Sequence, residues 1–125
     1  MSSEFGAIMQ MGYIVNDVDA AAREWAARVG AGPFYLLDSM VFDQYYFRGK
    51  RMVLELRLAF GYWNQLQIEL ITPLNDADTL YSRALRNSPD KLNHCATVVA
   101  DVDALLARHR LQDRAQPVVP EARHD

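Results

Sequence analysis

Apolar and polar residues alternate along the chain with two different periods, which predict strands and a helix in a definite order. Four segments have the short apolar or alternating pattern of β-strands: residues 8–15, 34–42, 52–60 and 66–70. Between the first two, apolar residues recur at helical spacing over 18–29, which predicts a helix with one buried face. Asp17 is placed to cap the start of this helix and Gly30 to end it.

The first strand–helix pair is repeated later in the chain. Residues 10–20 align without a gap with residues 94–104. The identical pairs are Val15/Val99, Asp17/Asp101, Val18/Val102, Asp19/Asp103 and Ala20/Ala104. We interpret this as an internal duplication. The elements expected after residue 72 are a short helix at 79–86, a strand at 92–99 and a helix from 101 to about 111. Residues 113–125 carry prolines and many charges, so we expect a tail or at most one irregular strand, and hence a second unit cut short.

These elements predict an α+β fold in a single domain over residues 1–125. We expect a mixed βαβββ sheet with the helices on one face, followed by a partial second unit of one strand and one helix. The expected parts are a complete first unit at 7–72, a linker with a short helix at 73–91, the partial unit at 92–112 and a tail at 113–125. A chain of 125 residues, 50% of them hydrophobic, has the composition of one globular domain.

Composition then excludes several classes of protein. The net charge is −3, so no basic surplus is present to neutralise nucleic-acid phosphates. No apolar run is long enough to span a bilayer, and we see no secretory signal, so a soluble cytoplasmic protein is expected. The single cysteine, Cys95, cannot form an intrachain disulfide. Because neighbouring strand residues point to opposite faces, we expect Cys95 to lie opposite His94, as a buried structural thiol.

The βαβββ unit followed by a second unit that begins in the same way resembles the vicinal oxygen chelate superfamily. That superfamily includes glyoxalase I, methylmalonyl-CoA epimerase, extradiol dioxygenases and bleomycin-resistance proteins. The resemblance covers residues 7–112, is closest to the glyoxalase-like branch, and is strongest in five segments: residues 10–17, 30–34, 46–49, 66–71 and 92–96. It implies two sheets side by side in an open half-barrel, with a divalent metal held by the first and last strands of each unit.

The resemblance also assigns the metal ligands. They fall at Gln10, Glu69 and His94, and Glu69 is expected to be a ligand or the catalytic base. The fourth ligand belongs to the last strand of the second unit, which this chain is expected to lack. An imidazole, a carboxylate and an amide oxygen form a weak set for Mg²⁺, Mn²⁺, Co²⁺, Ni²⁺ or Zn²⁺. Each residue also has an ordinary interpretation, as a strand residue with satisfied hydrogen bonds.

Alternation within the strands predicts a polar wall beside Glu69. Residues 65 and 67 share its strand parity, whereas the leucines and isoleucine between them face the other way. The expected substrate-binding residues are Gln65, Gln67, Arg57 and Tyr35. Arg57 and the tyrosine also have ordinary interpretations, as a solvated charge and as packing or interface.

Three functions remain open at this level. The first is a metal-dependent lyase or isomerase/epimerase acting on a small carbonyl or thioester substrate. The second is a non-catalytic small-molecule-binding protein, similar to bleomycin-resistance proteins, that uses the cup of a homodimer after losing the metal site. The third is a degraded fragment without activity. A homodimer is expected because the strand at 92–99 would otherwise end the sheet with an exposed edge.

Overall fold

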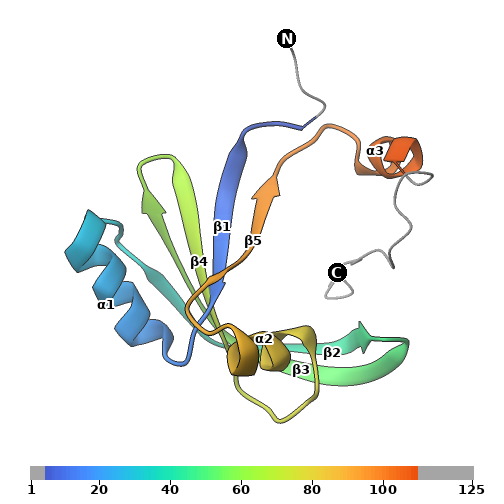
Figure 1. The fold of residues 1–125 in the computed structure, drawn as a ribbon, viewed down its shortest axis with the longest axis horizontal. Helices are drawn as coiled ribbons and strands as arrows, with labels where there is room; N and C mark the ends of the chain where they lie inside the picture. The colour runs from blue at the N-terminus through green and yellow to red at the C-terminus, as the bar shows by residue number, and fades with distance from the viewer. Residues whose placement is uncertain (1–4, 110–125) are drawn as a thin grey trace.

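The structure is a computed structural model that describes residues 5–109. Its elements are β1 (Ile8–Ile14), α1 (Val18–Val29), β2 (Tyr35–Phe47), β3 (Lys50–Trp63), β4 (Leu66–Pro73), α2 (Leu80–Asn87), β5 (Leu92–Thr97) and α3 (Val102–His109) (Figure 1). The predicted element order is confirmed over this range. The predicted end of the last helix and the tail at 113–125 lie outside the described residues. Among the described helices, none has the length and apolar character needed to cross a bilayer.

The five strands form one mixed sheet in the order β2-β3-β4-β1-β5. β1 is parallel to β4, and the other neighbouring pairs are antiparallel. The strand predicted by the duplication, β5, therefore lies directly beside its counterpart β1. Within residues 5–109, β5 is an end strand whose outer edge is unpaired, as the sequence predicted.

β2 and β3 are longer than the sequence predicted. They form a hairpin whose turn is Arg48 and Gly49, with φ values of 54° and 79°. Polar residues at 43 and 44 interrupt the apolar pattern, which hid the end of β2 in the sequence. These two residues lie at a shift in register between the pairs Phe42↔Leu54 and Tyr45↔Met52. Beyond this shift the strands pair again up to the turn.

Two apolar clusters cover the two faces of this sheet. On the face that carries α1, the buried residues are Val15, Val18, Ala59, Ile68 and Leu70. On the other face, hereafter the inner face, α2 packs against a cluster that includes Ile14, Leu54, Leu56 and Ile71. The prediction that the helices share one face is therefore wrong. Buried apolar residues of the two central strands lie on both faces, Ile68 and Leu70 of β4 on the α1 face and Leu54 and Leu56 of β3 on the inner face, so a helix packs against each face.

α1 begins and ends where the sequence predicted. The Asp17 carboxylate accepts hydrogen bonds from the backbone amides of Asp19 and Ala20 at 2.9 and 3.3 Å. At the other end, Gly30 has a left-handed φ of 73°, which an alanine would adopt only with strain. Val18 is buried, whereas Val29 is 40% exposed, so the predicted apolar stripe is buried at its start and open at its end.

The partial second unit is packed less closely than the first. Val102 and Leu106 of α3 are 56% and 51% exposed, and Figure 1 shows α3 set apart from the sheet. Cys95 pairs with Met11 and so lies on the α1 face, as predicted. The prediction that this thiol is buried is wrong, because Cys95 is exposed. Neither α1 nor α3 packs closely on β5 in the part of the chain that the structure describes.

Candidate active site

Cross-strand pairing gathers most of the predicted site residues in two neighbouring rows on the inner face. One row runs across all five strands: Tyr35, Phe60, Glu69, Gly12 and His94. The next row contains Tyr62, Gln67, Gln10 and Ala96. Glu69 and His94 come from segments far apart in the sequence, yet only β1 separates their strands in the sheet.

Glu69 and His94 meet directly across β1. His94 Nε2 lies 3.1 Å from Glu69 Oε1, and the two side chains are 35% and 15% exposed, respectively. The other ring nitrogen, Nδ1, lies 2.9 Å from Asn93 Oδ1. Which of the two ring nitrogens donates depends on the tautomer of the imidazole. The pair is thus a partly buried carboxylate held against an imidazole on the inner face, between the central strand β4 and the end strand β5.

Gly12 is the residue that makes this contact possible, and the sequence analysis did not single it out. It pairs with both Glu69 and His94, and the His94 ring lies over its Cα. A Cβ on Gly12 would lie 2.7 Å from His94 Nδ1 and would overlap two further ring atoms. A glycine inside a predicted strand is the signal that was available, since such glycines often mark the close approach of another group.

A chain of hydrogen bonds forms the second row. Gln10 Nε2 donates to Gln67 Oε1 at 2.7 Å, and Gln67 Nε2 donates to the Tyr62 hydroxyl at 3.3 Å. Among residues 5–109, no donor contacts Gln10 Oε1, so this amide oxygen is available to a ligand. The row therefore sets a polar, partly ordered wall beside the Glu69–His94 pair.

Three of the predicted substrate-binding residues lie apart from this pair. Gln65 is in the turn between β3 and β4 and is exposed, so it does not continue the polar wall. Tyr35 is on the inner face at the far end of the Glu69 row and is 66% exposed. Arg57 pairs with Thr72 and so lies on the opposite face. There its Nε donates to the Asp38 carbonyl oxygen at 3.3 Å and lies 3.8 Å from the Asp38 carboxylate.

The donors at this site fit a divalent cation only as an incomplete set. Within the described residues, no three His, Cys, Asp or Glu side chains cluster closely enough to hold a metal ion. The available donors are the Glu69 carboxylate, the His94 imidazole and the free Gln10 amide oxygen one row away. Such a mixed oxygen and nitrogen set suits a borderline divalent cation with further positions open to water or substrate.

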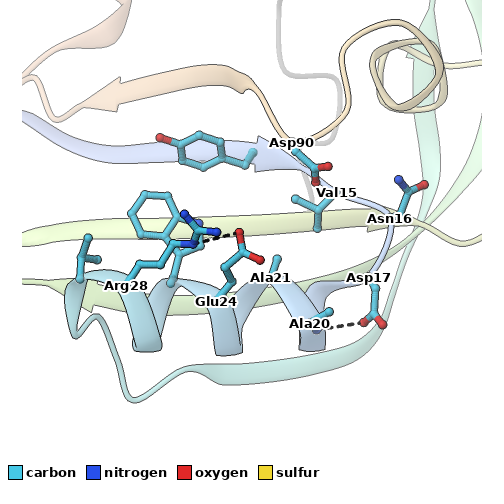
Figure 2. Close-up of a pocket in the computed structure, with 11 residues that line it drawn as sticks. Val15, Asn16, Asp17, Ala20, Ala21, Glu24, Arg28 and Asp90 are labelled. Atoms are coloured by element: carbon cyan, nitrogen blue, oxygen red, sulfur yellow. Dashed lines mark hydrogen bonds and ion pairs between the residues drawn. The ribbon is translucent and has the colours of Figure 1, made fainter.

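A separate pocket of about 560 Å³ lies on the other face, between α1 and β1. Figure 2 shows Ala21 and Glu24 pointing from α1 toward β1, with Asp90 on the far side of the pocket. Tyr13 and Trp25 pack here with ring centroids 5.3 Å apart, and burial raises the pKa of Tyr13. Glu24 is engaged by Arg28 at 3.4 Å. The pocket therefore brings together no carboxylate and imidazole, in contrast to the inner face.

Comparison with known proteins places this architecture in a family. The family model described as Glyoxalase/Bleomycin resistance protein/Dioxygenase superfamily matches residues 9–123. Methylmalonyl-CoA epimerase from Mycobacterium tuberculosis superposes with a TM-score of 0.65 at 23% identity, covering 90% of this chain and 67% of that one. A single-residue variant of the Streptomyces coelicolor methylmalonyl-CoA epimerase, in complex with 2-nitronate-propionyl-CoA, superposes with a TM-score of 0.62 at 23% identity. This match covers 86% of this chain and 70% of that one.

A hypothetical protein from Bacillus halodurans also superposes, with a TM-score of 0.61 at 14% identity, covering 84% of this chain and 67% of its own. At these identities the structures share the fold, and the chain spans about two thirds of their length. No functionally curated protein matches the sequence. The family match confirms the resemblance expected from the five sequence segments. The chain therefore belongs to the Glyoxalase/Bleomycin resistance protein/Dioxygenase superfamily.

Proposed function

We propose that this protein is an isomerase or lyase of the glyoxalase type, which moves a proton next to the carbonyl of a small carbonyl or thioester compound. The observation that carries the proposal is the 3.1 Å contact between Glu69 Oε1 and His94 Nε2. Several structural neighbours are named as epimerases of methylmalonyl-CoA, a thioester, which supports this reaction class.

The reaction needs a proton acceptor and a group that stabilises charge on the carbonyl oxygen. Glu69 is the acceptor: its side chain is 15% exposed, so it is partly desolvated yet still reachable. His94 holds one carboxylate oxygen, which fixes the orientation of the other. The amide nitrogens of Gln10 and Gln67 each have a second hydrogen beyond the bond already described, and these can donate to a carbonyl oxygen.

The same residues are those that would hold a divalent metal. Glu69 and His94 would bind it, with Gln10 Oε1 as the third donor, and the candidates are Mg²⁺, Mn²⁺, Co²⁺, Ni²⁺ and Zn²⁺. A bound cation of this kind supplies polarisation of the carbonyl and stabilisation of the enolate charge. Glu69 is then assigned two roles, ligand or proton acceptor, which the experiment below separates.

We also propose that the protein acts as a homodimer that associates along β5. The outer edge of β5 is unpaired within the described residues, and unpaired edges are templates for strand addition. Leu92, at the start of this strand, is 52% exposed, and Val98, just after it, is 69% exposed. Sedimentation equilibrium would test this directly. A monomer at all concentrations would refute it.

The proposed function is tested by metal titration and by hydrogen exchange on the same set of proteins. Metal-stripped protein is titrated with each of the five cations by calorimetry, and carbonyl and thioester compounds are screened in D₂O for loss of the proton next to the carbonyl. Glu69→Gln is expected to slow exchange by about 10²–10⁴-fold. Glu55→Gln is the matched control, because the Glu55 side chain lies on the face of the sheet opposite to Glu69. There its carboxylate accepts a hydrogen bond from the Ser39 hydroxyl.

The outcomes separate the roles of Glu69 and the competing functions. If Glu69→Gln abolishes both metal binding and exchange, the carboxylate is a ligand. If it abolishes exchange alone, the carboxylate is the proton acceptor. If no cation binds and no compound exchanges in the native protein, the proposed activity is wrong, and a non-catalytic small-molecule-binding protein replaces it.

A further inference from the structure

We propose that a second pocket, between the β2–β3 turn and α2, binds a phosphate ester through Arg48, Lys50 and Arg83. The pocket has a volume of about 350 Å³. Its apolar wall consists of Phe47, Met52 and Ala77, and its polar part consists of the three cations and Asp78. This inference is independent of the proposed function, because it concerns neither Glu69 nor His94.

The charges around this pocket are unbalanced. Its single acidic residue, Asp78, is already bound by Arg83, whose Nε and Nη2 donate to the two carboxylate oxygens at 2.8 Å each. The hydrogen bonds and charge of Arg83, with smaller contributions from the charges of Arg86 and Arg48, hold the pKa of the Asp78 carboxyl below its usual range. Within residues 5–109, the Arg48 and Lys50 side chains have no hydrogen bond or ion pair. Three cations against one carboxylate leave the lining of this pocket positively charged, in a protein whose net charge is −3.

Two of the cations are also held in place before any ligand binds. The guanidinium carbons of Arg48 and Arg83 each lie 5.2 Å from the centre of the Phe47 ring. Arg83 is fixed further by its two bonds to Asp78. Because these side chains are already ordered, they lose less conformational entropy when an anion binds between them.

The residue at position 48 is itself unusual for this turn. Arg48 has a φ of 54° and Gly49 a φ of 79°, so both turn residues are left-handed. Two-residue hairpin turns of this kind favour Asn, Asp or Gly, because other side chains are strained there. Arg48 adopts this strained conformation, and its side chain lines the pocket.

Both size and wall chemistry indicate a phosphate ester rather than free phosphate. A phosphate dianion matches the fork of an arginine and the ammonium of a lysine. The apolar wall leaves room for a small organic group beside it. The pocket is also distinct from the Glu69 site: Met52 is eight residues along β3 from Phe60, the cross-strand neighbour of Glu69, which is about 26 Å of strand.

The test compares phenyl phosphate with inorganic phosphate by calorimetry, at constant ionic strength set with sodium chloride. Arg48→Asn removes the charge and places in the turn a residue that tolerates the left-handed conformation, and Lys50→Gln removes the second cation. Arg28→Gln is the matched control, because Arg28 lies on α1, away from this pocket. We expect one saturable site for phenyl phosphate, weakened about tenfold or more by each pocket variant and unchanged in the control.

Each other outcome is decisive as well. Tighter binding of inorganic phosphate than of phenyl phosphate would overturn the assignment of an ester. No saturable binding of either compound up to about 10 mM would overturn the site itself. Equal weakening by Arg28→Gln would show that the anions respond only to overall charge, which also overturns the proposal.

Discussion

Replacing Gly12 with alanine tests the central geometric feature of the candidate site. The added methyl group would overlap the His94 ring, reaching 2.7 Å from Nδ1. The ring must then leave its place over β1, and its contact with Glu69 is lost although neither residue is changed. The variant therefore shows the effect of losing the contact between Glu69 and His94 while both side chains are still present.

The magnitude follows from two opposing effects. Alanine in the middle of a strand is favoured over glycine by about 0.5–1 kcal/mol of unfolding free energy. Overlap with a packed group costs about 1–3 kcal/mol. His94 lies on the end strand and its side chain is 35% exposed, so the ring can rotate away from the added methyl group. The cost of the overlap is therefore expected at the lower end of that range. In a His94→Ala background the overlap disappears, and Gly12→Ala is expected to stabilise by about 0.5 kcal/mol.

The assay is a double-mutant cycle measured by urea denaturation, with tryptophan fluorescence reporting unfolding. The four proteins are the native chain, the two single variants and the double variant. We expect a coupling energy of at least about 1 kcal/mol between positions 12 and 94. A coupling below about 0.3 kcal/mol would refute the placement of the His94 ring over Gly12. If the pair binds metal, Gly12→Ala should weaken that binding as His94→Ala does.

Three further predictions address the frame around the two sites. Thr79→Ala should cost about 0.5–2 kcal/mol by urea denaturation, because its hydroxyl caps α2 and its side chain is fully buried; a loss below about 0.3 kcal/mol would contradict this. Asp78→Asn should lower stability at pH 7 and lower it less near pH 3: the hydrogen bonds from Arg83 lower the pKa of this carboxyl in the folded protein, so its contribution to stability is present above the unfolded pKa of about 3.9 and disappears as the pH falls through the folded pKa. Equal losses at both pH values would count against that linkage. Leu106→Gln should change stability by less than about 0.5 kcal/mol, because Leu106 is 51% exposed, and a larger loss would mean that α3 is packed.

Features that depend on spacing along the chain were predictable from the sequence. The helical period over 18–29, the Asp17 cap and the left-handed Gly30 all appear where the pattern places them. The duplication correctly identified β5 and predicted that it would end the sheet. Glu69 and His94 were selected by the family resemblance, and the fold does bring them into contact.

Features that depend on how strands meet were decided by the tertiary structure alone. Alternation shows which residues of one strand share a face, but a shift of one residue in register exchanges the faces between strands. This is why Arg57 lies on the far side of the sheet from Glu69, while Tyr35 lies on the same side. Likewise, the exposure of Cys95 depends on whether a helix covers β5, which no local pattern states.

The sequence by itself therefore determined the elements, their order and the family, because these follow from local periodicity, capping and motif order. Only the tertiary structure decided that α2 covers the inner face, that Gly12 leaves room for His94 to reach Glu69, and that Arg83 joins Arg48 on the Phe47 ring. Each of these arrangements brings together residues distant in the chain. Such contacts are set by register, twist and packing across the whole sheet, and the pattern along any one segment does not contain them.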